Sequence, residues 1–190
     1  MIQTVRLDQV SPQRWRNGGG STQELLTWPT ATDWIVRISV AQIERDGPFS
    51  AYPGIERWFA VVSGDGVTLG FDGQAIQLNP ESDPLQFDGA TSPGCVLRSG
   101  PTTDLNLMVQ SESARGGMQR VAPAADWHSD ARFRAVYSAE EATLQIDATA
   151  SVSIAAGTLA WSDSSAGERW RLIADNAALS AWWMEVWPKR

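Results

Sequence analysis

The stretch Phe49-Ser50-Ala51-Tyr52-Pro53-Gly54-Ile55-Glu56-Arg57, followed by an apolar run and by Gly64-Asp65-Gly66, has the layout of a metal-binding hairpin in a small β-barrel. In such a hairpin, two His residues separated by one residue are followed by a Glu and then by a strand that ends in Gly. Counted back from Gly64, Ser50 and Tyr52 take the two His places, and Arg57 takes the Glu place. Each metal ligand of the pattern is therefore replaced.

Arg57 changes the chemistry that this hairpin predicts. A guanidinium stays protonated and offers only hydrogen-bond donors. It repels a divalent cation and attracts an anion. The stretch thus predicts a pocket for a carboxylate or another acceptor-rich small molecule, and we expect neither a metal nor another cofactor in it.

Composition limits the class of protein. A chain of 190 residues can form one good core or two small ones, and its 43% apolar and 19% charged residues are typical of a globular protein. The net charge of −7 disfavours a nucleic-acid partner, because an acidic surface repels phosphates. Lys189 is the only lysine, so nearly all positive charge is arginine, which suits bidentate pairing with carboxylates.

Three observations bear on the cellular compartment. The single Cys95 excludes an internal disulfide and a cysteine-based zinc cluster, and we expect it to be a small buried residue. The N-terminus lacks the pattern of a secretory signal, and no apolar run approaches the roughly 20 residues of a membrane helix. We therefore expect a cytoplasmic protein without a membrane partner.

The chain contains ten tryptophans, four of them in its last 21 residues. Aromatic strands in a barrel would use them as core or interface filling. Stacking against carbohydrate is the alternative that we consider less favoured, because buried Trp usually packs.

Secondary-structure signals predict strands almost throughout. Sixteen Gly and ten Pro residues punctuate short β-branched or aromatic runs, which is typical of a β-barrel or sandwich. Residues 111–130 are polar and poorly periodic, which predicts a linker, and residues 138–141 carry a weak signal for a short helix. The predicted strands cover 34–41, 57–63, 67–71, 74–78, 85–87, 95–98, 105–109, 143–146, 151–154, 169–175 and 181–186.

The run Gly18-Gly19-Gly20 precedes the first clear strand. Ordering three consecutive glycines on folding costs much backbone entropy. One interpretation is a loop whose N–H groups approach an anion closely. The other is a sharp bend or bulge where the chain enters the barrel. Both remain open at this point.

Asp104, Asn106 and Met108 share one face of a predicted strand. If that face lines the barrel lumen, Asp104 and Asn106 converge there with Arg37, Ser39 and Arg57. Two arginines against one aspartate leave a positive charge for a ligand. The alternative is a set of buried ion pairs without a ligand, in which Glu24 supplies the second carboxylate.

Nothing in the sequence indicates nucleophilic catalysis. The only histidine is His128, and no Gly-x-Ser-x-Gly elbow accompanies it. An exposed His without a fixed partner is the expected outcome. We assign no catalytic residue.

The motifs described so far resemble those of the HutD/Ves family of cupin-like proteins, in the family's order and over roughly the first 110 residues. They are Trp15-Arg16-Asn17-Gly18-Gly19-Gly20, Thr22, Glu24, Trp34, Arg37-Ile38-Ser39-Val40-Ala41-Gln42-Ile43, Gly47-Pro48-Phe49-Ser50-Ala51-Tyr52-Pro53-Gly54, Arg57, Gly64, Phe87-Asp88-Gly89, Gly100-Pro101 and Asp104-Leu105-Asn106-Leu107-Met108. The resemblance implies an all-β bicupin with little helix and no metal: two cupin-type (RmlC-like) barrels in one chain. We expect residues 1–112 to form the first barrel, and residues 113–190 to form a linker and a smaller cupin-like unit.

The resemblance also implies a role. HutD members are linked to bacterial histidine utilisation as regulators, with N-formylglutamate as the proposed ligand, whereas Ves members are linked to stress responses. The glycine run looks more like the HutD branch. One departure is that Val109-Gln110-Ser111-Glu112 stands where family members often carry arginine, which implies a difference in affinity or ligand choice if those arginines contact the ligand.

We therefore expect a non-enzymatic protein that senses or sequesters a small anionic metabolite. The alternatives are a metal-independent isomerase or hydrolase with Glu24 or Asp104 as base, and a stress-related Ves-like interaction protein. In the latter, the Trp-rich C-terminal segment would form a homodimer or partner interface. The predicted ligand-binding residues are Asn17, Gly19, Glu24, Arg37, Ser50, Tyr52, Arg57, Asp104 and Asn106.

Overall fold

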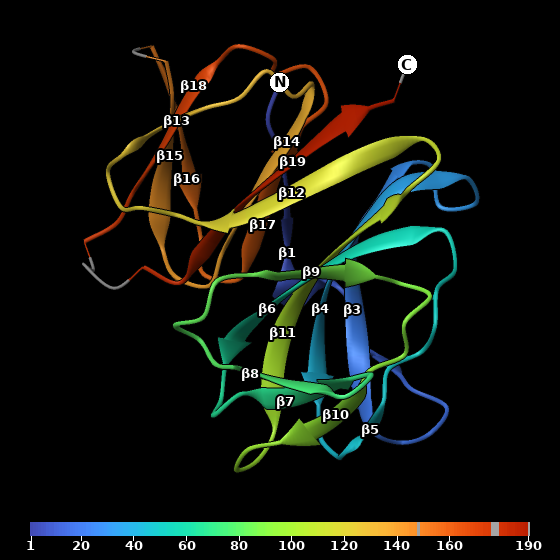
Figure 1. Cartoon of the computed structure of the whole chain (residues 1–190). Coiled ribbons are helices and arrows are strands. Elements are labelled where there is room, and N and C mark those ends of the chain that lie inside the picture. Colours follow the sequence, from blue (N-terminus) through green and yellow to red (C-terminus); the bar gives the residue numbers. More distant parts are fainter. Residues whose placement is uncertain (148, 176–178, 190) are drawn as a thin grey trace. The chain divides into compact units, whose positions relative to one another are not determined.

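The computed structural model describes residues 1–147, 149–175 and 179–189, which form two compact units. The first unit comprises Val10–Arg115 with Lys189, and the second comprises Met1–Gln9 with Gly116–Pro188. Both are built from antiparallel strands (Figure 1). A three-residue 3₁₀ turn, η1 (Leu7–Gln9), is the only helical element described, and no helix in the described residues is long and apolar enough to cross a membrane.

The first unit consists of two facing sheets. Its six-stranded sheet has the order β2 (Gln13–Arg14), β3 (Gly20–Pro29), β4 (Trp34–Ile43), β11 (Thr102–Gln110), β6 (Ile55–Ser63) and β9 (Leu85–Asp88). Its four-stranded sheet has the order β5 (Gly47–Pro48), β10 (Gly94–Leu97), β7 (Val67–Phe71) and β8 (Gln74–Leu78). Side chains from both sheets, among them Phe59, Leu69 and Cys95, form the core. Cys95 is buried, as predicted.

The second unit repeats this plan. Its five-stranded sheet has the order β1 (Gln3–Arg6), β17 (Thr158–Ser162), β14 (Phe133–Ser138), β19 (Ala181–Pro188) and β12 (Ala114–Arg120). Its four-stranded sheet has the order β13 (Asp126–His128), β18 (Arg169–Ile173), β15 (Ala142–Ile146) and β16 (Ala150–Ile154).

The strand pairings of the two units correspond. Strand β6 pairs with β9 and β11, and β14 pairs with β17 and β19. Likewise β7 pairs with β8 and β10, and β15 pairs with β16 and β18. Strand β14 thus takes the place of β6, and the prediction of two cupin-type barrels is confirmed at the level of the fold.

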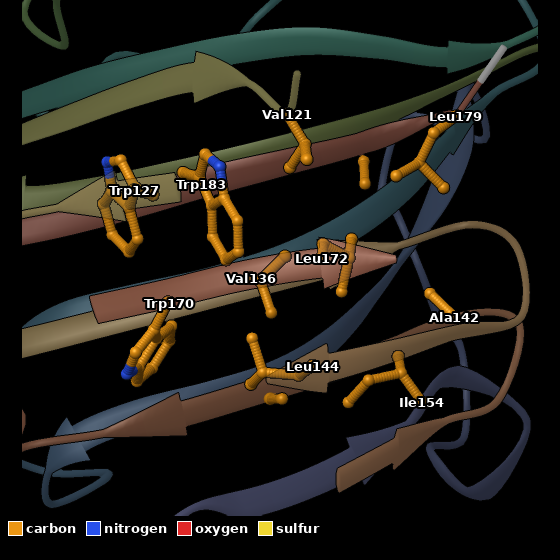
Figure 2. Close-up of a cluster of buried hydrophobic side chains, with 12 residues drawn as sticks. Val121, Trp127, Val136, Ala142, Leu144, Ile154, Trp170, Leu172, Leu179 and Trp183 are labelled. Carbon is orange, nitrogen blue, oxygen red and sulfur yellow. The ribbon is translucent and has the colours of Figure 1, made fainter. Parts of the chain in front are cut away.

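Tryptophan fills the core of the second unit (Figure 2). The rings of Trp127 and Trp183 stack with centroids 4.6 Å apart, and Trp170 meets Trp127 edge-on at 5.9 Å. Trp182 is fully buried as well. The prediction that the C-terminal tryptophans pack is confirmed for these residues, and their buried rings are not displayed for stacking on carbohydrate.

Three expectations differ from the structure. Residues 1–9 belong to the second unit, because β1 pairs along β17, with Gln3 opposite Trp161. The predicted linker contains strands β12 and β13, which gain their order from pairing with distant strands. No helix forms at 138–141, since Ser138 ends β14 and its hydroxyl bonds to the backbone of Glu140.

Tight turns connect the strands of the first unit. At Gly66, such a turn leaves no space for a side chain. Its φ is +90°, and a Cβ there would lie 2.0 Å from the carbonyl oxygen of Leu78. Gly73 has a similar φ of +77°, but a Cβ there would meet nothing within 4 Å. The two positions therefore separate conformational strain from steric overlap.

We predict that Gly66→Ala destabilises the protein much more than Gly73→Ala does. The left-handed backbone costs alanine about 1–2 kcal/mol at either position, and the overlap at Gly66 adds roughly 2 kcal/mol or more. Urea unfolding followed by tryptophan fluorescence measures both. Equal losses of stability would show that the β7–β8 hairpin shifts freely to make room.

Candidate functional site

A polar cavity of about 410 Å³ lies within the first unit. Its wall combines the inward faces of β4, β6 and β11 with the segments around residues 13–17 and 48–52. The lining residues are Gln13, Arg14, Trp15, Arg16, Asn17, Thr22, Arg37, Ser39, Ala41, Pro48, Phe49, Ser50, Tyr52, Arg57, Asp104, Asn106 and Met108.

Strand register brings the predicted polar residues together. Met108 on β11 lies opposite Arg37 on one side and Arg57 on the other, so the two arginines flank it in one row. Asn106 lies opposite Ser39 in the next row, and Asp104 follows two residues further along β11. Because side chains alternate along a strand, all of these face the cavity while the intervening residues pack on the other side of the sheet.

Arg57 is buried with only 7% of its surface exposed, and aromatic rings surround it. Its guanidinium carbon lies 5.0 Å from the ring centre of Phe87, 5.3 Å from that of Phe49 and 5.6 Å from that of Tyr52. Such contacts stabilise a desolvated cation. Burial lowers the pKa of Arg57, against the charge of Asp104, but a guanidinium remains charged at neutral pH.

Few acceptors satisfy this cation. One terminal nitrogen of Arg57 donates to Asn106 Oδ1 at 3.0 Å, and the other makes a long bond of 3.4 Å to the carbonyl oxygen of Ser50. Its Nε is buried and has no hydrogen-bond partner among the described residues. Arg57 therefore retains donor capacity for an added acceptor.

Asp104 is the carboxylate nearest to this cation in the wall, and Asn106 bridges the two. The Asn106 amide donates to Asp104 Oδ1, while Asp104 Oδ2 is buried without a partner in the described structure. Burial raises the pKa of Asp104 to about 7, although the charge of Arg57 and the Asn106 bond lower it. At neutral pH this carboxyl group can therefore take up or release a proton.

Arg37 has its own carboxylate. Its Nε lies 2.7 Å from Glu24 Oε2, in an ion pair whose angle does not satisfy hydrogen-bond geometry. The structure thus brings Glu24 to the second arginine, as the sequence suggested, but Glu24 itself does not line the cavity.

The glycine run forms the turn between β2 and β3. The Gly19 N–H donates to Asn17 Oδ1 at 2.9 Å, so this group is already taken. A Cβ on Gly20 would lie 2.1 Å from the carbonyl oxygen of Gln42, which explains why glycine is needed there. This geometry supports the sharp bend rather than the anion-binding loop.

Seven of the nine predicted ligand-binding residues line the cavity, while Gly19 and Glu24 do not. The sequence did not single out Arg14, Trp15, Arg16 or Phe49 as cavity residues, although Trp15, Arg16 and Phe49 stand within the quoted motifs and Arg14 directly precedes the first of them. The sequence did carry a signal for three of them, because Arg14, Trp15 and Arg16 directly precede the predicted ligand-binding residue Asn17. What the sequence alone lacked was the β2–β3 turn that brings this segment to the cavity.

The charge of the wall is opposite to that of the chain. Four arginines line the cavity beside a single acid, Asp104, in a protein of net charge −7. Arg14 is paired with Glu44 at 2.7 Å, and Arg37 is paired with Glu24. Arg57 and the exposed Arg16 have no ion-pair partner among the described residues. The cavity is therefore suited to an anion.

The second unit contains a closed counterpart of this arrangement. Arg134, on the strand that takes the place of β6, is fully buried, with its guanidinium 4.5 Å from the ring centre of Trp170 and 5.3 Å from that of Trp127. It donates to Ser165 Oγ at 3.0 Å, to the carbonyl oxygen of Glu168 at 2.7 Å and to that of Ser165. Ser165 and Glu168 thus supply Arg134 with the hydrogen-bond acceptors that Arg57 lacks.

Among the described residues, no group of three His, Cys, Asp or Glu side chains is placed to hold a metal ion. His128, on β13 of the second unit, is exposed, as predicted. These observations leave the arginine-lined cavity as the candidate site.

Sequence comparisons place this chain within a known family. The family model described as HutD matches residues 7–180. A Pseudomonas putida protein described as an uncharacterized 21.2 kDa protein in the hutC 3′ region is 32% identical over 120 residues, covering 62% of this chain and 63% of that one. Protein Ves of Citrobacter koseri is 33% identical over 103 residues, covering 53% and 54%. The matched part thus spans between half and two thirds of these curated relatives.

Solved structures agree with the strand pairing. HutD from Pseudomonas fluorescens SBW25, in a formate condition, has a TM-score of 0.86 at 25% identity, and the match covers all of both chains. Oxalate decarboxylase from Bacillus subtilis, a cupin, has a TM-score of 0.64 at 8% identity, covering 97% of this chain and 76% of that one, which shows likeness of fold alone. Because the family model covers nearly the whole chain and the barrels are of the cupin type, this protein belongs to the HutD family and is a bicupin.

Proposed function

We propose that this protein binds a small anionic metabolite in the cavity of its first unit, with Arg57 as the principal anchor. The observation that carries the proposal is the incomplete satisfaction of a buried guanidinium, whose Nε has no partner, in a wall of four arginines and one acid. A charged donor in a partly desolvated cavity bonds strongly to a carboxylate.

The size and chemistry of the wall favour a compact ligand with more than one acceptor. A cavity of about 410 Å³ is at the small end of ligand sites. N-formylglutamate offers two carboxylates and a formamide oxygen, which suit Arg57, Arg16 and the amide of Asn17. The P. putida relative is described by its position in the hutC 3′ region, which supports a role in histidine utilisation. We infer a sensor or a sequestering protein for such a metabolite.

A metal-independent isomerase or hydrolase is the second candidate, and Asp104 favours it. A carboxyl group with a pKa of about 7 suits a general base or acid at neutral pH. Glu24 is a weaker candidate base, because it pairs with Arg37 and does not line the cavity.

The Ves-like interaction role through Trp-rich strands receives less support. Trp182 and Trp183 lie in the core, and the half-buried Trp187 donates to Asp130 within the second unit. A homodimer interface would need other residues.

Arg57→Ala should abolish binding of N-formylglutamate. Loss of a buried charged donor typically costs 2–5 kcal/mol, which is about 30-fold or more in affinity. Isothermal titration calorimetry measures the effect, with glutamate and urocanate as comparison ligands. Arg57→Lys keeps the charge but loses the fork of donors, so we expect intermediate affinity.

Arg45→Ala is the matched control, since Arg45 is exposed and does not line the cavity. It should bind as the unchanged protein does. Unchanged affinity in a folded Arg57→Ala protein, verified by circular dichroism, would contradict the anchoring role.

The binding and enzyme proposals predict different fates for the ligand. A sensor returns N-formylglutamate unaltered, whereas an enzyme with Asp104 as base converts it, and Asp104→Asn stops the conversion. Proton NMR of the ligand during prolonged incubation separates them. Turnover that disappears in Asp104→Asn but persists in Arg45→Ala would favour the enzyme.

A further inference from the structure

Asp104 Oδ2 is an unsatisfied acceptor in the wall of the cavity. The residues opposite Asp104 on the neighbouring strands are Ala41 on β4 and Val61 on β6, and both are buried and apolar. Asn106 bonds only to Oδ1. A bare carboxylate oxygen in such surroundings is unfavourable, because nothing replaces the water that it loses.

The charged and titratable groups described around Asp104 do not supply the hydrogen-bond donor that Oδ2 lacks. The charge of Arg57 on β6 attracts Asp104, but its hydrogen bonds reach Asp104 only through Asn106, and Arg37 on β4 is paired with Glu24. Tyr52, in the segment before β6, lies against Arg57. From the opposite sheet comes the Cys95 thiol, whose pKa burial raises to about 12, with Asp104 and Asp46 adding to the rise, so it is uncharged at neutral pH.

We propose that Asp104 is the proton-carrying residue of this pocket: an anionic ligand binds to Arg57 with Asp104 protonated on Oδ2, so that ligand and proton enter together. This inference rests on the proposed anion-binding function. One proton is taken from solvent, one O–H bond forms on Oδ2, and no other bond changes. The occupied site then gains no net charge from a singly charged ligand group.

Two effects link the proton to the anion. A ligand carboxylate near Arg57 repels an ionised Asp104 and weakens the attraction that Arg57 gives it. Both effects raise the proton affinity of Asp104, whose pKa burial already places at about 7. Linkage requires the reciprocal effect, so a protonated Asp104 strengthens anion binding.

The protonated acid also determines which ligands fit. Oδ2–H becomes a buried donor that needs an acceptor, such as a carboxylate or a neutral carbonyl oxygen. An ammonium group offers only donors and meets the positive charge of Arg57. The pocket is therefore selective for carboxylated compounds whose nitrogen is acylated or absent over free amino acids.

Calorimetry with N-formyl-L-glutamate between pH 5.5 and 9, in buffers of low and high ionisation enthalpy, tests the coupling. The ligand carboxylates stay ionised throughout this range. We expect nearly constant affinity below about pH 6, a fall of about tenfold per pH unit above about pH 8, and uptake of close to one proton per ligand at pH 8.5. Asp104→Asn, a permanently neutral donor of the same shape, should bind with little pH dependence and no proton uptake.

The outcomes separate the two proposals. Binding with no proton uptake and no loss of affinity at high pH overturns the role of Asp104 and leaves anion binding intact. Absence of binding at every pH overturns the anion-binding function, and the coupling with it. Because both readouts use the unmodified protein, they do not depend on the folding of a variant.

The free protein gives an independent prediction. Burial raises the pKa of Asp104 in the folded state to about 7, above its value in the unfolded chain, so the folded state holds the extra proton between those two values. Stability relative to Asp104→Asn should therefore fall as pH rises from about 4 to about 7 and then level off. Thermal unfolding of both proteins at pH 5 and pH 8 should show a change in the Tm difference on the order of 5 °C. A difference independent of pH would mean that Asp104 is ionised throughout.

Discussion

A buried guanidinium cannot lower the free-energy cost of its burial by losing its proton. A barrel that encloses one must therefore provide hydrogen-bond acceptors or aromatic faces for it. Arg57 and Arg134 meet this requirement in different ways. Arg134 is surrounded by two tryptophan rings and by three hydrogen-bond acceptors, which belong to Ser165 and Glu168. Among the described residues, Arg57 has three aromatic rings but only one good acceptor, the side chain of Asn106. The first unit therefore encloses an incompletely satisfied guanidinium, whereas each side-chain nitrogen of Arg134 has a hydrogen-bond partner.

The same constraint explains the coupling between Arg57, Asn106 and Asp104. An amide has a donor end and an acceptor end, so Asn106 can bond to a cation and a carboxyl group at once. This arrangement keeps the two charged groups from pairing directly. Oδ2 of Asp104 and Nε of Arg57 are consequently both left without a hydrogen-bond partner among the described residues. The wall of the cavity is therefore positive in a protein whose net charge is −7.

Local patterns predicted much of this site. Alternation along 34–41 and 104–108 was enough to place Arg37, Asp104 and Asn106 on one face, and the spacing of the hairpin was enough to place Arg57 beside them. The acceptors of Arg57 could not be deduced, because they depend on the register between β6 and β11. The same holds for β12, whose glycines and polar residues carry a weak strand signal and whose order comes from tertiary pairing. The segment 13–17 reached the cavity through the β2–β3 turn, whose form the three glycines did not reveal.

The pairing of β1 with β17 bears on how the chain is made as well as on how it is arranged. The first unit is encoded almost continuously by residues 10–115, so it can form its sheets while the rest is still being synthesised. Strand β1 precedes the first unit in the chain but finds its neighbour β17 only after residues 158–162 have followed. Until then, its backbone donors and acceptors on that side have no strand to pair with, and closing so long a loop is slow. The unit that contains Arg57 is thus the part that can be complete first, and the unit that contains Arg134 is completed only after the strands of residues 158–188 have followed.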